Sequence, residues 1–141
     1  MKTVLTLWVL LVAGSALAGE INQQRAQFNY QMSCQGCHAP DGSGANSVPR
    51  MRDHVGNFLV TEAGREYLVR VPGSAVSALG DAELAEVLNW IVVEFAGSSA
   101  QESFKPYSSQ EVGRLRQQPL NEVIQYRAQL LADIASANTR E

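Results

Sequence analysis

Apolar residues are spaced as on one face of a helix over a long segment near the middle of the chain. Six of them recur with a helical period, namely Leu84, Val87, Leu88, Ile91, Val92 and Phe95. Asp81 precedes them as the predicted N-cap, Glu83 lies in the first turn, and Gly97 is a natural end. The pattern predicts a buried helix from Asp81 to about Phe95, with Trp90 on the flank of its apolar face.

Shorter apolar patterns precede this segment. Asn22 is a residue type that favours the N-cap position, and the residues after it place Ala26 and Tyr30 on one face. No strand-like alternation of apolar and polar residues interrupts these patterns, so we predict an all-α fold. Three helices are expected here, at Asn22–Met32, Val55–Val60 and Glu62–Val69.

Two more helices are predicted after Phe95. A shift in composition at Gly97–Gln101 indicates a linker. Ser108 and Glu111 then form a capping-box pattern for a short helix. The last helix is longer and amphipathic, and the apolar residues of its stripe are Leu120, Val123, Ile124, Leu130, Leu131 and Ile134.

These patterns divide the chain into three predicted parts: residues 1–18, the core at 19–97 and a helical extension at 98–141. The extension has two interpretations. It folds back over the core, anchored by Phe104 and Tyr107, or it presents a docking face to a partner protein or a second copy. In the second case its charge would come from Arg114, Arg116 and Arg127.

The first eighteen residues have the pattern of a secretory signal peptide. Lys2 gives a positive start, Val4–Val12 is an apolar run, and Ala16-Leu17-Ala18 is a cleavage signal before Gly19. The run is short for a membrane span, although an uncleaved N-terminal anchor is the alternative. We therefore expect a soluble protein exported to a bacterial periplasm, with no membrane span after cleavage.

Charge narrows the class of partner. The 141 residues include 11 basic and 14 acidic side chains, a formal charge of −3. Loss of Lys2 with the signal peptide leaves 10 basic residues against the same 14 acidic ones, a charge of −4. This surface argues against nucleic acid or anionic membrane as a partner and suits a protein with a basic patch.

The residues with distinctive chemistry are Cys34-Gln35-Gly36-Cys37-His38, the Cys-x-x-Cys-His spacing that attaches a c-type haem. Two thiols three positions apart can each bond one vinyl group of a porphyrin, and the adjacent histidine then becomes the proximal iron ligand. A zinc site would need further Cys or His ligands, and the chain offers only His54. A redox-active Cys-x-x-Cys would need a βαβ context, which the helical pattern lacks.

From Ile21 to Phe95 the sequence resembles the class I c-type cytochromes. Ala26, Tyr30 and Trp90 occupy positions where that family packs its first helix against its last core helix, with Ala in place of the more usual Gly. The resemblance implies a cytochrome c core around one covalent haem. Pro49-Arg50-Met51 is similar to the family's Pro-x-Leu, which implies that the Pro49 carbonyl accepts a hydrogen bond from His38 Nδ1 and that Met51 packs on the proximal side.

The sixth iron ligand stays open at this stage. The family places a distal Met in the loop that corresponds to Val71–Gly80, and here that loop contains neither Met nor His. Met51 and His54 are the main candidates, and Met32 is a third that would more naturally belong to the core. Otherwise the iron is five-coordinate or closed by water.

The resemblance implies one-electron transfer in the periplasm, between a dehydrogenase or quinol-side donor and an oxidase or reductase, with no catalytic residue in the chain. The ligand-free loop motivates a different class, a haem protein with an open distal site that acts as a small peroxidase or gas sensor. A third hypothesis makes the chain a haem-bearing subunit of a larger dehydrogenase, with the extension as its interface.

Overall fold

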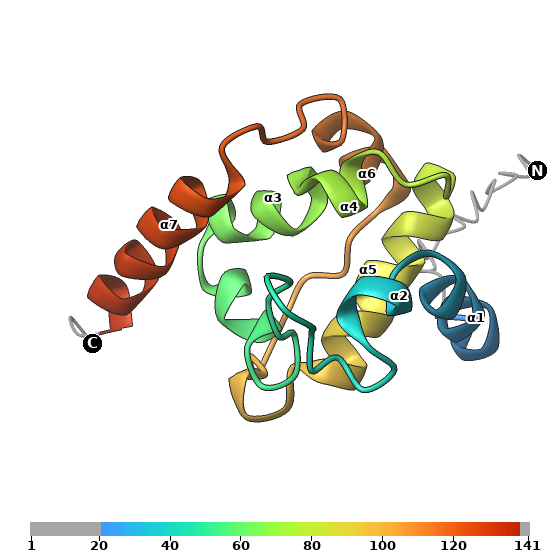
Figure 1. The fold of residues 1–141 in the computed structure, drawn as a ribbon, viewed down its shortest axis with the longest axis horizontal. Coiled ribbons are helices and arrows are strands. Elements are labelled where there is room, and N and C mark those ends of the chain that lie inside the picture. Colours follow the sequence, from blue (N-terminus) through green and yellow to red (C-terminus); the bar gives the residue numbers. More distant parts are fainter. Residues whose placement is uncertain (1–20, 139–141) are drawn as a thin grey trace, which may run out of the picture.

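The computed structural model describes residues 21–138, which fold into helices joined by loops (Figure 1). Within this range there is no β-strand, only an isolated bridge between Ala45 and Val48. The all-α prediction is confirmed, whereas the predicted signal peptide lies outside the described residues. In chain order the elements are α1 (Gln23–Ser33), α2 (Gln35–His38), the 3-10 helix η1 (Val55–Val60), α3 (Glu62–Arg70), α4 (Pro72–Ala75), α5 (Asp81–Phe95), the 3-10 helix η2 (Gly97–Ser99), α6 (Ser109–Leu115) and α7 (Val123–Asn138).

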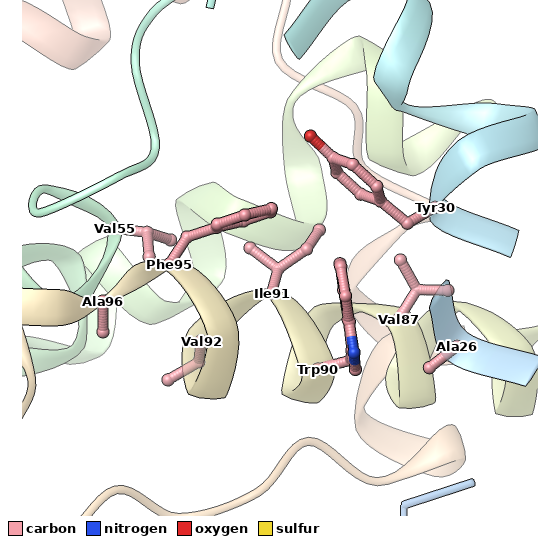
Figure 2. Packing of buried hydrophobic residues seen from close by; sticks show 9 residues of the cluster. All are labelled: Ala26, Tyr30, Val55, Val87, Trp90, Ile91, Val92, Phe95 and Ala96. Atoms are coloured by element: carbon pink, nitrogen blue, oxygen red, sulfur yellow. The ribbon is translucent and has the colours of Figure 1, made fainter. Parts of the chain in front are cut away.

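The crossing of α1 and α5 forms the main core. Ala26 is completely buried at the contact, and the Tyr30 ring centroid lies 5.1 Å from that of Trp90 and 5.3 Å from that of Phe95. Figure 2 shows Tyr30 reaching from α1 toward this aromatic cluster on α5. At the edge, Arg25 and Glu86 form an ion pair at 2.7 Å. The predicted packing of Ala26 and Tyr30 against Trp90 is confirmed.

The ends of these helices match the sequence pattern except at the start of α5. Asn22 caps α1 as expected, because its side chain accepts a hydrogen bond from the Arg25 N–H at 3.0 Å. The predicted N-cap of α5 is wrong by one residue, since Gly80 is the cap and Asp81 the first helical residue. Glu83 still accepts from the Gly80 N–H at 3.0 Å.

The segment predicted as a plain loop after α3 contains the short helix α4. Pro72 is its first residue, where a proline loses no hydrogen bond because that N–H would have no intrahelical partner. Only residues 76–80 connect α4 to α5. The carbonyls of Ser77 and Leu79 in this segment accept hydrogen bonds from Arg116.

The segment predicted as a linker is packed against the core. Ser99 is buried, its Oγ accepts from the Gly56 N–H at 3.0 Å and donates to the Ala96 carbonyl at 2.7 Å. The remainder of the extension covers core surface, with Phe104 partly buried and Tyr107 buried. These contacts support the interpretation in which the extension folds back. No described helix has the length and apolarity needed to cross a membrane.

α6 and α7 contact different parts of the core. α6 packs on α5 and α3 through Val112 and Leu115. α7 packs on η1 and α3, where Leu130 and Ile134 meet Phe58. Figure 1 shows α7 beside α3, away from the crossing of α1 and α5.

Candidate haem site

A cavity of about 760 Å³ lies among the helices, and α2 and α7 both contribute to its wall. Cys34, Cys37 and His38 line one part of it. Apolar side chains make most of the remaining wall, including Val55, Phe58, Leu68, Val71, Leu84, Val87, Leu88, Ile91 and Leu131. The predicted haem-attachment residues therefore open onto a single apolar cavity.

Local backbone bonds fix the two thiols. The Cys34 carbonyl accepts hydrogen bonds from the N–H groups of Cys37, at 3.1 Å, and His38, at 3.0 Å, so the pentapeptide is a short helical turn. Cys37 is exposed and Cys34 half-buried. Burial, with a smaller effect from the charge of Cys37, raises the pKa of the Cys34 thiol to about 11. Both sulfurs are unpaired thiols at the cavity wall, as covalent attachment to a porphyrin requires.

His38 has the surroundings expected of an iron ligand. Desolvation by burial lowers the pKa of His38, and the backbone of Pro49 opposes this in part. The imidazole is therefore held neutral, the form that binds a metal. Nδ1 of His38 is buried and has no hydrogen-bond partner among residues 21–138. The Pro49 backbone acts on the His38 side chain, while the hydrogen bond from Nδ1 to the Pro49 carbonyl that the resemblance implies stays a prediction.

Backbone hydrogen bonds connect the loop after His38 to Met51. Gly44 donates to the His38 carbonyl at 3.0 Å, and the Met51 N–H donates to the Gly42 carbonyl at 2.8 Å. Gly42 has φ +73°, and a Cβ there would lie 2.9 Å from the Phe95 ring, so a side chain would disturb the loop. Met51 lines the cavity, but on the segment that also carries Pro49.

The other two sulfur or imidazole candidates for the sixth ligand point elsewhere. Met32 is 70% exposed and His54 is exposed, and neither is part of the cavity wall in the described structure. The sequence could not decide this, because the path of the loop around His54 depends on contacts such as that of the Asp53 N–H with the Phe95 carbonyl at 2.8 Å.

Sequence reasoning missed that α7 lines the cavity. Val123, Ile124, Arg127, Ala128 and Leu131 all reach it, from a helix about ninety positions beyond the cysteines. The signal in the sequence was the predicted apolar stripe, which includes Ile124. In the structure Ile124 is 83% exposed and lines the cavity, so part of this stripe is not used for packing on the core.

A stack of rings supports the wall beside α7. The Tyr67 ring lies 5.0 Å from Phe58 and 6.2 Å from Tyr126, nearly parallel to both. Burial raises the pKa of the Tyr67 hydroxyl, while the charge and side-chain contact of Arg127 lower it to a smaller extent. Tyr67 is therefore a neutral phenol at pH 7 in the protein without haem.

These residues fit a covalently bound haem. The wall offers two thiols, a neutral imidazole and a large apolar surface. Among the described residues that line it, the only ones with charged side chains are Arg50 and Arg127, both positive, which suits the two carboxylates of a haem. The zinc alternative finds no support, because residues 21–138 contain no group of three or more His, Cys, Asp or Glu that could hold a metal ion.

Comparison with known proteins also points to a haem protein. No family model matches the chain. A cytochrome c-552 of Thermus thermophilus is 32% identical over 130 residues, which cover 79% of this chain and 84% of that protein. A second cytochrome c-552 of Thermus thermophilus is 33% identical over 106 residues, which cover 62% of this chain and 81% of that protein.

Proposed function

The chain belongs to the c-type cytochromes and binds haem c covalently, and we propose that it is an exported one-electron carrier in which Cys34 and Cys37 hold the haem and His38 is the proximal ligand. The observation that carries the proposal is the cavity: both thiols and the buried imidazole line one apolar space. We assign no catalytic residue, in keeping with an electron-transfer protein.

The protein's part in this function is to bind the haem, to orient the His38 imidazole and to exclude water. A bound haem supplies an iron that gains and loses one electron. The apolar wall keeps solvent from it, and the rigid turn at Cys34–His38 fixes the imidazole. A hydrogen bond from His38 Nδ1 to the Pro49 carbonyl would hold the ring in one orientation and raise its basicity.

A cytochrome exchanges electrons with redox partner proteins, and we propose a periplasmic dehydrogenase or quinol-side complex as donor and an oxidase or reductase as acceptor. The acidic balance of the chain favours partners with a basic docking surface. Of the three arginines considered for docking, only Arg114 is exposed, while Arg116 is bound to the core and Arg127 lines the cavity. Among these three, Arg114 is therefore the one best placed to contact a partner.

A redox titration of the haem-loaded protein tests this function, with the visible spectrum recorded at each potential. We expect one reversible one-electron step. His38→Ala should abolish the normal spectrum and shift the potential, whereas His54→Ala, the matched histidine outside the cavity, should leave both unchanged. An irreversible titration, or a His54→Ala variant that behaves as His38→Ala does, would contradict the proposal.

A further inference from the structure

The wall of the cavity away from Pro49 and Met51 lacks a side chain that commonly ligates haem iron. Among the described residues of α3, α4 and α7 that line it, there is no Met, His, Cys or Lys. Tyr67 is held neutral by burial. This part of the described wall therefore offers no side chain that would commonly bind the iron of a haem held by Cys34, Cys37 and His38.

Arg116 fixes the segment that follows α4. It donates four hydrogen bonds of 2.7–3.0 Å, to the carbonyls of Ala75, Ser77 and Leu79 and to the Asp81 carboxylate. The planar guanidinium suits such a set of acceptors, and the side chain is only 12% exposed. The loop is thereby held by the extension, and its shape does not depend on a bond to iron.

Within the segment held by Arg116, the carbonyl of Ser77 is hydrogen-bonded but its hydroxyl is not. It lines the cavity, and its Oγ is buried without a hydrogen-bond partner among residues 21–138. A buried hydroxyl without a partner is unfavourable, because it has lost its hydrogen bonds to water and gained none in return. Such a group is expected to find a partner in what the cavity holds.

We propose that the open side of the haem pocket is a binding site for a small exogenous ligand that accepts a hydrogen bond, with Ser77 as the donor and Arg116 as the residue that positions it. The ligand class includes water or hydroxide in the resting protein and diatomic or anionic molecules such as cyanide. This inference rests on the proposed function, because it requires a haem held by Cys34, Cys37 and His38.

The first arm of the test asks whether the site is open. Carbon monoxide is added to the reduced holoprotein, and the visible bands are expected to shift promptly. Unmoved bands would overturn the inference and show a protein ligand, which Met51→Ala would then identify by opening the site. Reversible one-electron titration of the same sample keeps the two proposals separate: an open site without reversible redox chemistry contradicts the carrier function alone.

The second arm asks whether Ser77 contacts the ligand. Cyanide binding to the oxidised protein is followed in the Soret band. Loss of one hydrogen bond predicts a roughly five-fold higher dissociation constant for Ser77→Ala. Ser77→Thr keeps the hydroxyl and should restore much of the affinity, and Ser103→Ala on the surface should change nothing. Equal affinities for the Ser77 and Ser103 variants would overturn the role of Ser77.

The third arm separates positioning from general stabilisation. Arg116→Lys keeps the charge but cannot bind all four acceptors, so it should weaken cyanide binding, while Arg114→Lys on the exposed side of α6 should not. In the double variant with Ser77→Ala, the two effects should fall short of their sum, because Arg116 acts through Ser77. Full additivity would contradict the assigned role of Arg116.

Discussion

α6 and α7 belong to the same extension, but different kinds of contact attach them to the core. Besides the apolar packing of Val112 and Leu115, α6 is held by directional polar contacts, among them a bidentate ion pair in which Arg65 Nε lies 2.6 Å from Glu111 Oε1. Just before α6, Asn89 pairs with the Tyr107 backbone in both directions, at 2.7 and 3.0 Å. α7 instead packs with apolar residues, as where Leu130 and Ile134 meet the core. Directional contacts allow one orientation, whereas apolar packing tolerates small shifts.

The difference corresponds to what each helix does at the cavity. The C-terminal end of α6 carries Arg116, which must reach four fixed acceptors, so this helix needs a unique position. α7 presents Ile124 and Leu131 to the cavity and can adjust to what lies there. The first is a rigid support, and the second is a wall that the haem helps to hold.

The largest expected effect is a difference in stability between two truncated chains. Ending the chain after Gly97 removes six buried apolar residues, namely Tyr107, Val112, Leu115, Leu120, Leu130 and Ile134. At roughly 1.5–3 kcal/mol for each buried side chain, the loss is on the order of 10 kcal/mol, comparable with the whole stability of a small domain. Ending it after Leu120 removes only Leu130 and Ile134 of this set, and roughly 3–6 kcal/mol.

Thermal melting of the two haem-loaded truncations measures this contrast. The shorter chain should fail to fold, and the longer one should fold with a lower Tm. A truncation after Gly97 that melts like the full chain would show that α6 is no support at all.

Glu111→Ala tests the polar attachment of α6. It leaves the guanidinium of Arg65 buried without its partner, so the free energy of unfolding should fall by about 3–5 kcal/mol. Glu66→Ala breaks a more exposed pair with Arg70, and its effect should stay below about 1 kcal/mol. Urea unfolding of both variants measures the two losses of stability. Equal losses would contradict the burial of the Arg65–Glu111 pair.

Leu130→Ala tests the apolar attachment of α7. Leu130 is 4% exposed, so the substitution should lower the free energy of unfolding by about 2–4 kcal/mol. Ile124→Ala, on the cavity side of the same helix, should lower it by about 1 kcal/mol, through the contact with haem. Hydrogen exchange in α7 should rise in both variants while exchange in α6 stays the same. Faster exchange in α6 would show that the two attachments are coupled.

The smallest effect is a pH dependence confined to α6. The hydrogen bond with Arg65 lowers the pKa of Glu111 in the folded protein. Its contribution to stability is therefore complete above the unfolded value of about 4.3 and is lost as the pH falls through the lower folded value. Glu111→Gln should reduce the slope of stability against pH in this acid range, and Leu130→Ala should leave the slope unchanged. An unchanged slope in Glu111→Gln would contradict the assignment.

Much of this architecture could be predicted from local sequence. The helical periods and the Asn22 cap depend on spacings within one element. The packing of Tyr30 against Trp90 was expected from the resemblance to the class I c-type cytochromes, and not from local spacing. The start of α5 could not be predicted as well, because Asp81 looks like a cap and is instead bound by Arg116, thirty-five positions later. An ion pair at that distance leaves no local pattern.

The cavity was harder to predict for the same reason. The pentapeptide identifies the attachment residues without any structure, but the opposite wall combines residues from α3, α4 and α7. Periodicity showed that α7 has an apolar face and could not show that Leu130 contacts the core while Ile124 contacts the cavity. That distinction depends on the rotation of a packed helix.

The late position of α7 in the chain also has a consequence for the order of assembly. The attachment cysteines come near the start of the folded region and belong to a local turn, whereas α7 completes the cavity only when residues 123–138 dock on η1 and α3. Contacts over long sequence separations form slowly compared with local turns. We therefore expect an interval in biosynthesis when the turn that carries the thiols is formed and accessible and the last wall is absent. Pulsed hydrogen exchange during refolding should show protection of the Cys34–His38 turn before that of α7, and simultaneous protection would contradict this order.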